Sequence, residues 1–194
     1  LPDDRVMVSV RNQDRIVFVE PDGRVDTAWT LGAEDDYEII NEQHNADYIP
    51  AARGGPAVIV SDSHNNRIVE YQREDGAWNR TWIWRDERMQ WPRDADRLPD
   101  GGTLITDSNG NRVFKANASG AIDWSVDVEV PYEAERLGTG DESANGSSAA
   151  ALGLESRRYT DPVGEKGVQR DGGGGSIVRS FWLSVRSLLP SLLT

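Results

Sequence analysis

The sequence contains no cysteine, which excludes disulfide bonds and thiolate metal ligands. Lysine is nearly missing as well: Lys115 and Lys166 are the only two among 21 basic residues, and the rest are arginine. Acidic residues number 33, so the net charge is −12. Such a surface disfavours nucleic acid, whose phosphates bind to basic patches. We interpret this composition as an adaptation to salt, because self-repulsion keeps halophile proteins soluble.

A secretory signal peptide is also missing. The stretch from Leu1 to Asp4 has neither a basic start nor an apolar run. Apolar residues make up 37% of the chain, which is enough for the core of one ordinary domain only if the C-terminal tail is left outside it. The chain begins without an initiator Met, so we expect it to be a piece of something longer.

Two stretches of the chain are closely similar: VSDSHNNRIVEYQREDGAW, residues 60–78, and ITDSNGNRVFKANASGAIDW, residues 105–124. A third, weaker copy appears on aligning Arg15, Arg67 and Arg112, which are 52 and 45 residues apart. A short β-branched run lies on each side of each arginine, and a turn with glycine and a tryptophan-bearing run follow. The runs expected to form strands are 6–10, 57–61 and 103–106 before the arginines, and 16–19, 68–71 and 113–116 after them.

Another strand is expected at each of the aligned segments 45–50, 94–99 and 133–137. Four antiparallel strands repeated every ~40–50 residues are the pattern of a β-propeller blade. A β-sandwich has similar strands without such self-similarity, and a β-helix has shorter repeats. The pair Asn109–Gly110 predicts a type I′ hairpin turn, which needs a positive φ at both central residues. The sequence therefore predicts an all-β protein, a partial β-propeller of four-stranded antiparallel blades.

Residues 1–137 hold about three blade-equivalents, made of two complete blades and two fragments. Leu1 aligns with Leu98, so the chain begins where an innermost strand ends, and residues 132–137 supply an innermost strand with no outer strands after it. Propellers usually need ~4–8 blades to close a ring. Because a shorter array leaves open sheet edges, we expect this chain to be the C-terminal part of a larger propeller.

The chain changes character after the predicted blades. Residues 138–175 are rich in Gly, Ser, Ala and charge, and they predict a loop and a flexible Gly-rich linker. Residues 176–194, SIVRSFWLSVRSLLPSLLT, place apolar residues on one broad helical face. This amphipathic helix is short and is interrupted by Arg179, Arg186 and Pro190, so it does not span a bilayer alone. We expect it to lie on a membrane surface or to begin a membrane anchor; the alternative is a helix packed on the rest of the protein.

His44 shares a column of the repeat alignment with Arg93 and Tyr132, at the mouth of the innermost strands that line a propeller's channel. These three side chains suit an anion, with arginine as a planar fork and histidine as a base or nucleophile. The next column holds Asn45 and Asp94, which are further candidates for substrate binding. Acids near these columns would orient the imidazole by accepting a hydrogen bond from one ring nitrogen; the acids are Asp94, Glu133, Asp47, Asp96 and Glu135.

Two other patterns favour simple turns. His64 lies in the turn after residue 61, and the polarity of a turn accounts for it. Residues 107–111, DSNGN, begin like a calcium loop, but Arg112 takes the sixth position and Ala118 the twelfth, where glycine and glutamate are needed. We therefore predict no metal site and no organic cofactor.

The stretches DADRLPDGGTLITDSNGNRV, residues 94–113, and PYEAERL, residues 131–137, resemble the arylsulfotransferase-like propeller proteins of salt-loving archaea. The resemblance covers residues 1 to about 155 closely. It implies a channel histidine that takes the sulfuryl group from an aryl sulfate and passes it to a phenol, with other histidines and an arginine on the sulfate oxygens. Blades of this family often read H-D-x-D/E-R-L at the innermost strand. His44 matches that pattern, with Asn45 in place of the first aspartate, whereas the next blade has Arg93 in the histidine column.

The resemblance thus implies sulfuryl transfer through His44, with Arg93 neutralising charge on the sulfuryl oxygens. It implies an aryl sulfate and a phenol as partners, and with the amphipathic tail it favours a membrane-associated protein outside the cytoplasm. The alternative is a non-catalytic, membrane-associated propeller that binds a protein, peptide or glycan. A third, weaker option is a quinone-binding propeller, because Trp and Gly recur near the blade ends.

Overall fold

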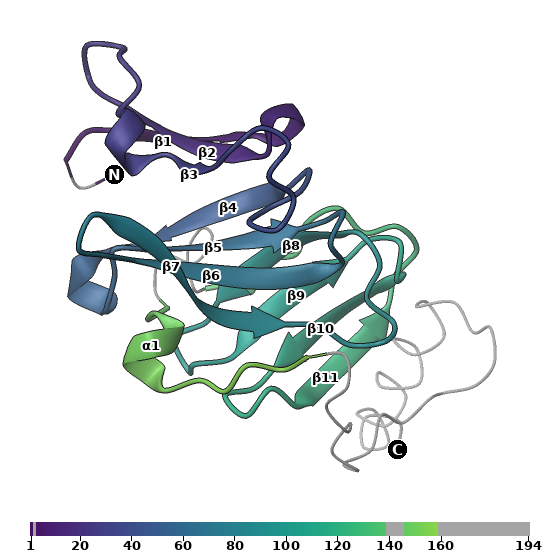
Figure 1. Ribbon diagram of the computed structural model, residues 1–194. Coiled ribbons are helices and arrows are strands. Elements are labelled where there is room, and N and C mark those ends of the chain that lie inside the picture. The colour runs from purple at the N-terminus through teal and green to yellow at the C-terminus, as the bar shows by residue number, and fades with distance from the viewer. Residues whose placement is uncertain (2, 139–145, 159–194) are drawn as a thin grey trace, which may run out of the picture.

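The computed structural model describes residues 1, 3–138 and 146–158. They form three antiparallel sheets that follow one another in chain order, as Figure 1 shows. The first sheet consists of β1 (Val6–Val10), β2 (Arg15–Val19) and β3 (Leu31–Gly32). The second consists of β4 (His44–Ile49), β5 (Ala57–Asp62), β6 (Arg67–Glu74) and β7 (Ala77–Trp84). The third consists of β8 (Pro92–Arg97), β9 (Thr103–Asp107), β10 (Arg112–Ala116) and β11 (Ile122–Asp127). Short helices are η1 (Arg11–Gln13), η2 (Thr27–Trp29), η3 (Ala51–Arg53) and α1 (Ala149–Leu152).

The predicted all-β fold and its repeated four-stranded blades are confirmed. In the second and third sheets each strand pairs with its neighbour in the chain, so each sheet is a complete up-and-down blade with β4 or β8 at one edge. Every β-branched run named in the sequence lies within a strand, because such side chains pack well on a pleated, buried surface.

The core lies between the sheets, and alternation along β5 divides it in two. Val58 and Val60 belong to the apolar cluster shared with the first sheet, whereas Ala57 and Ile59 belong to the cluster shared with the third. All residues of β5 are buried, because both of its faces are covered. Phe18 of β2 stacks on Trp78 of β7 with ring centroids 5.8 Å apart, which joins the first two sheets.

The repeated D-S-x-x-N-R stretches form the turns between β5 and β6 and between β9 and β10. In both, the aspartate that ends one strand accepts a hydrogen bond from the Nε of the arginine that opens the next: Asp62 from Arg67 at 2.5 Å and Asp107 from Arg112 at 2.9 Å. The residue before each aligned arginine has a left-handed conformation: φ is 52° at Asp14, 52° at Asn66 and 53° at Asn111. The similar stretches therefore specify the same closed turn.

The predicted type I′ turn at Asn109–Gly110 is wrong, because the positive φ belongs to Asn111 and to neither of those residues. Gly110 is needed for a different reason. A Cβ atom there would lie 2.1 Å from an oxygen of Asp107, whose carboxylate folds over the turn toward Arg112. The glycine makes room for an ion pair.

The first sheet begins as the alignment of Leu1 with Leu98 predicts. The nitrogen of Leu1 donates to the carbonyl of Arg5 at 2.9 Å, as that of Leu98 donates to Gly102 at 2.8 Å. The described residues supply no inner strand beside β1. The expected inner strand at 132–137 is not formed: this segment is extended but pairs with no strand. A strand requires a partner, and the sheets within the described residues end at β11.

Residues 146–158 differ from the expected loop. They return along β7 and hold α1, drawn in green in Figure 1, where Ala149 is buried and its N–H donates to Glu70 at 2.7 Å. Arg157 forms a parallel bridge with Trp84. The linker at 159–175 and the amphipathic helix at 176–194 lie outside the described residues. Within the described part of the chain, no helix has the length and apolarity needed to cross a bilayer.

Candidate functional site

The candidate site lies where the inner strands β4 and β8 come together. From Ala46 and Ala95 onward the two strands pair with their sheets in equivalent register, so Asp47 corresponds to Asp96 as the alignment predicts. Each strand opens with a register shift, between His44 and Ala46 in β4 and between Pro92 and Asp94 in β8. A bulge re-aims the side chains next to it, so these shifts determine where the candidate residues point.

His44 is half-buried at the start of β4. Burial lowers the pKa of its imidazole, and the positive charges of Arg11 and Arg93 lower it further; the carbonyl and carboxylate of Glu42 act in the opposite direction. At neutral pH the ring is therefore uncharged, which leaves one nitrogen with a free lone pair. A neutral imidazole is the form that acts as a nucleophile or base.

The ring of His44 is oriented by a serine and not by an acid. Its Nδ1 lies 2.8 Å from the Oγ of Ser63, in the turn after β5. Sequence reasoning assigned this role to the acids of the inner strands, but these lie deeper along the channel. The repeated Asp-Ser pair marks Ser63 as part of a recurring turn. Nothing in the spacing of the sequence connects Ser63 with His44.

Arg93 and Tyr132 are brought together as expected. The guanidinium carbon of Arg93 lies 4.7 Å from the centre of the Tyr132 ring. The Nε of Arg93 is buried and has no hydrogen-bond partner within the described residues. Tyr132 is 54% exposed, so its ring borders the mouth. Arg93 is close enough for its charge to lower the pKa of His44.

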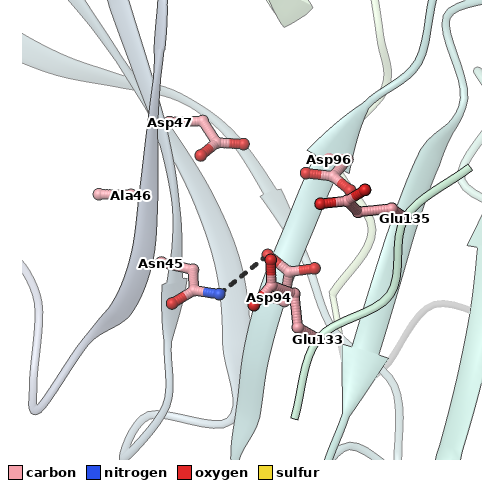
Figure 2. Close-up of a pocket in the computed structure, with 7 residues that line it drawn as sticks. All are labelled: Asn45, Ala46, Asp47, Asp94, Asp96, Glu133 and Glu135. Atoms are coloured by element: carbon pink, nitrogen blue, oxygen red, sulfur yellow. Dashed lines mark hydrogen bonds between the residues drawn. The ribbon is translucent and has the colours of Figure 1, made fainter. Parts of the chain in front are cut away.

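Asn45 and Asp94 lie together on the wall of an acidic cavity of about 140 Å³. The Nδ2 of Asn45 donates to Asp94 at 3.3 Å. Figure 2 shows carboxylates from β4, β8 and the segment after β11 gathered around this space. The other lining residues are Ala46, Asp47, Asp96, Glu133 and Glu135.

The pKa of Asp94 is strongly shifted. Burial raises its pKa to about 7; the charges of Asp47 and Glu133 act in the same direction, and the hydrogen bonds from Asn45 and the N–H of Ala134 oppose them. About half of the Asp94 carboxyls are therefore protonated at neutral pH. The cavity repels anions, so the mouth and the cavity beneath it differ in the charge they accept.

Trp91 is a member of the mouth that sequence reasoning missed. It directly precedes β8 and has a φ of 55°. Its ring lies 6.1 Å from that of His44 and 5.1 Å from that of His64, both edge-on. The guanidinium of Arg11 lies 5.8 Å from the same ring. His64, assigned from sequence to an ordinary turn, is thus across Trp91 from His44, with an exposed side chain.

Within the described residues, no group of three or more His, Asp or Glu side chains is placed to hold a metal ion. Asp107, the first residue of the calcium-like stretch, is held by Arg112 and by the N–H of Gln90. Both of its carboxylate oxygens therefore accept hydrogen bonds from the protein.

The fold and this mouth define the chain as part of a β-propeller, built of four-stranded antiparallel blades with polar residues on the inner strands. Among solved structures, the chain is similar to a periplasmic gluconolactonase of Pseudomonas aeruginosa, with a TM-score of 0.50 and 15% identity over 66% of this chain and 38% of that one. It is also similar to virginiamycin B lyase from Staphylococcus aureus, with a TM-score of 0.47 and 14% identity over 68% of this chain and 41% of that one.

No protein-family model and no curated protein matches the chain. The chain spans about two fifths of the length of the two structures above. At this identity the gluconolactonase likeness establishes the propeller fold and not an activity. The activity therefore has to be argued from the side chains at the mouth.

Proposed function

We propose that the chain is the part of an arylsulfotransferase-like propeller that transfers a sulfuryl group from an aryl sulfate to a phenol. One observation carries the proposal: the charge of Arg93 reaches the ring of His44 and lowers its pKa, and the buried Nε–H of Arg93 has no hydrogen-bond partner in the described chain. A buried donor without an acceptor is costly, and a sulfate oxygen would satisfy it. The resemblance of the inner-strand motifs to that family supports the same reaction.

In this reaction the lone pair of one His44 nitrogen attacks sulfur. The N–S bond forms, the S–O bond to the aryl group breaks, and the phenolate leaves with the electron pair. A phenol acceptor then attacks the same sulfur, the N–S bond breaks and its electron pair returns to the ring, while the acceptor's proton passes to the departed phenolate or to water. Arg93 stabilises the negative charge on the sulfuryl oxygens throughout.

The mouth suits such a substrate better than the cavity beneath it. Arg11 and Arg93 both supply positive charge that reaches His44. The rings of Trp91 and Tyr132 offer surfaces for an aryl group. The acidic cavity would repel a sulfate, so we place the sulfuryl group at the level of His44.

The test is release of nitrophenol from p-nitrophenyl sulfate by the full chain in the presence of phenol. We expect His44→Ala to abolish release and Arg93→Gln to lower it by ~10²–10³-fold, the usual effect of losing one donor to developing charge. His64→Gln is the matched histidine control and should keep the activity. No release by the wild-type protein, or equal release from His44→Ala, would refute the proposal.

A second candidate is a non-catalytic propeller that binds a cationic peptide segment at a membrane surface outside the cytoplasm. The acidic cavity favours it, because carboxylates attract a lysine or arginine side chain. Fluorescence polarisation with a labelled oligo-arginine peptide tests it. Exchanging Glu133 and Glu135 together for glutamine should weaken binding about tenfold or more, or ~1.4 kcal/mol. Unchanged binding would remove this candidate.

A further inference from the structure

Ser63 and Ser108 occupy the same position in two successive turns. Each side chain is fully buried, and each hydroxyl donates to the proline carbonyl that precedes the next inner segment: Ser63 to Pro92 at 2.6 Å and Ser108 to Pro131 at 2.5 Å. The first bond fastens the second sheet to the third, and the second fastens the third sheet to the segment after β11. Ser63 has an additional partner, because the Nδ1 of His44 lies 2.8 Å from its Oγ.

The protons in this arrangement can be assigned. A serine hydroxyl has one hydrogen to donate. Two oxygens 2.6 Å apart require a hydrogen between them, so the proton of Ser63 is directed at the carbonyl of Pro92. The carbonyl of Ser61, 3.3 Å away, is also an acceptor and brings no proton. The hydrogen between Ser63 and His44 must therefore come from the ring.

We propose that Ser63 is the positioning residue of His44: it holds the ring as the Nδ1–H tautomer and so leaves the lone pair on Nε2. The role of Nε2 as the nitrogen that attacks sulfur rests on the proposed function. The assignment of the Nδ1–H tautomer does not. The charged groups facing the ring are Arg11 from η1, Glu42 from the loop before β4, and Arg93 from β8. The backbone carbonyl of Glu42 is a further acceptor near the ring, and the side-chain partner of Nδ1 is the Ser63 hydroxyl.

In the proposed reaction, the uncharged Ser63 hydroxyl would stabilise a positively charged form of the His44 ring. Once Nε2 carries the sulfuryl group, the ring is positively charged and its Nδ1–H becomes a stronger donor. The Ser63 oxygen accepts that bond while its own proton stays on the Pro92 carbonyl, so no proton needs to move. Because Ser63 is bonded to Pro92, its position is fixed by the junction between the second and third sheets. The same junction therefore fixes the orientation of the His44 ring.

The tautomer is measurable without substrate, by long-range ¹H–¹⁵N correlation of the labelled imidazoles at pH 7.5. The chain has two histidines, so His64→Gln assigns the signals. We expect the Nδ1–H form for His44 in the wild type, which is the minor form of free histidine. Ser63→Ala should shift the ring toward the Nε2–H form, and Ser63→Thr, which keeps the hydroxyl, should not.

Ser108→Ala is the matched control, because it removes the equivalent serine–proline bond at a position whose hydroxyl donates to the Pro131 carbonyl and does not contact the His44 ring. It should leave the His44 signals unchanged. If sulfuryl transfer is present, Ser63→Ala should lower kcat about tenfold with little change in KM, the size of one hydrogen bond, and Ser108→Ala should not. An Nε2–H ring in the wild type, or the same spectrum from Ser63→Ala, would overturn the inference even if transfer occurs. A protein without transfer activity but with these spectra would refute the proposed function and leave the positioning role intact.

Discussion

The second and third sheets are built alike and differ where their inner strands open. Both have the aspartate–arginine pair of the turn and the serine bond to the next proline. At the mouth, however, one sheet presents His44 and the other presents Arg93. The repeated elements therefore support the scaffold, and the column that varies is the one in which chemistry has to be sought.

The three aligned arginines occupy equivalent positions in the repeat, but they differ in burial and in the groups that they bind. Arg112 is almost fully buried and binds two carboxylates, those of Asp107 and Asp86. Arg67 binds one carboxylate, that of Asp62, and two backbone carbonyls. Among the described residues, Arg15 pairs only with the exposed carboxylate of Glu34, because Val10 stands where the other copies have aspartate.

This comparison gives the largest expected effect. Arg112→Ala should lower the free energy of unfolding by about 3–5 kcal/mol, because it leaves two carboxylates with little access to water and without their cationic partner. Arg67→Ala leaves one such carboxylate, that of Asp62, and should lower the free energy of unfolding by less. Arg15→Ala should cost less than about 1 kcal/mol, as for surface ion pairs. Urea unfolding measured by tryptophan fluorescence gives the order.

The ranking is the test. Equal losses from all three variants would show that the arginines act through the turn conformation, which they share, and not through their different carboxylates. Asp86→Asn is the control for the extra partner of Arg112: it should bring the cost of losing Arg112 close to that of losing Arg67.

Much of the scaffold could be predicted from the sequence, since strand patterns and the spacing of the repeats depend on local chemistry. The β-branched runs lie in strands, and Asp47 and Asp96 correspond as aligned. The contacts within the candidate site were harder to predict. The contact between Ser63 and His44 joins the turn after β5 to the start of β4, beside a register shift, and the position of Trp91 depends on the unusual backbone before β8. Neither periodicity nor spacing records such contacts.

The acidic cavity offers a second comparison of the same strands, because Asp94 in β8 stands where β4 has Asn45. The pKa of Asp94 is raised in the folded chain, to about 7 from 3.8, so folding favours the protonated carboxyl. Its contribution to stability is present below about pH 4 and is lost as the pH rises through 7. Asp94→Asn keeps a neutral side chain at every pH. It should stabilise the protein by roughly 2–4 kcal/mol at pH 8 relative to the wild type, and the gain should vanish near pH 4.

The reciprocal change, Asn45→Asp, is the control. It places a second carboxylate within hydrogen-bond distance of Asp94 and should destabilise the protein at pH 8 more than at pH 5. Urea unfolding at the two pH values measures both variants. A gain from Asp94→Asn that did not depend on pH would show that packing, and not the charge, is responsible.

The smallest expected effect concerns Tyr132, which stands in the mouth column beside Arg93 but on a segment that pairs with no strand. If the ring holds this segment through Arg93, Tyr132→Leu should cost about 0.5–1 kcal/mol, the usual size of an exposed cation–π contact, and Tyr132→Phe should cost almost nothing. Because other contacts also change, the informative quantity is the coupling between Tyr132→Leu and Arg93→Met in a double-mutant cycle. Among the described residues the segment has further attachments: the bond from Ser108 to Pro131, the N–H of Ala134 on Asp94, and the ion pair of Arg136 with Asp100. A coupling near zero would assign its position to those bonds and leave Arg93 free to turn toward an anion at the mouth.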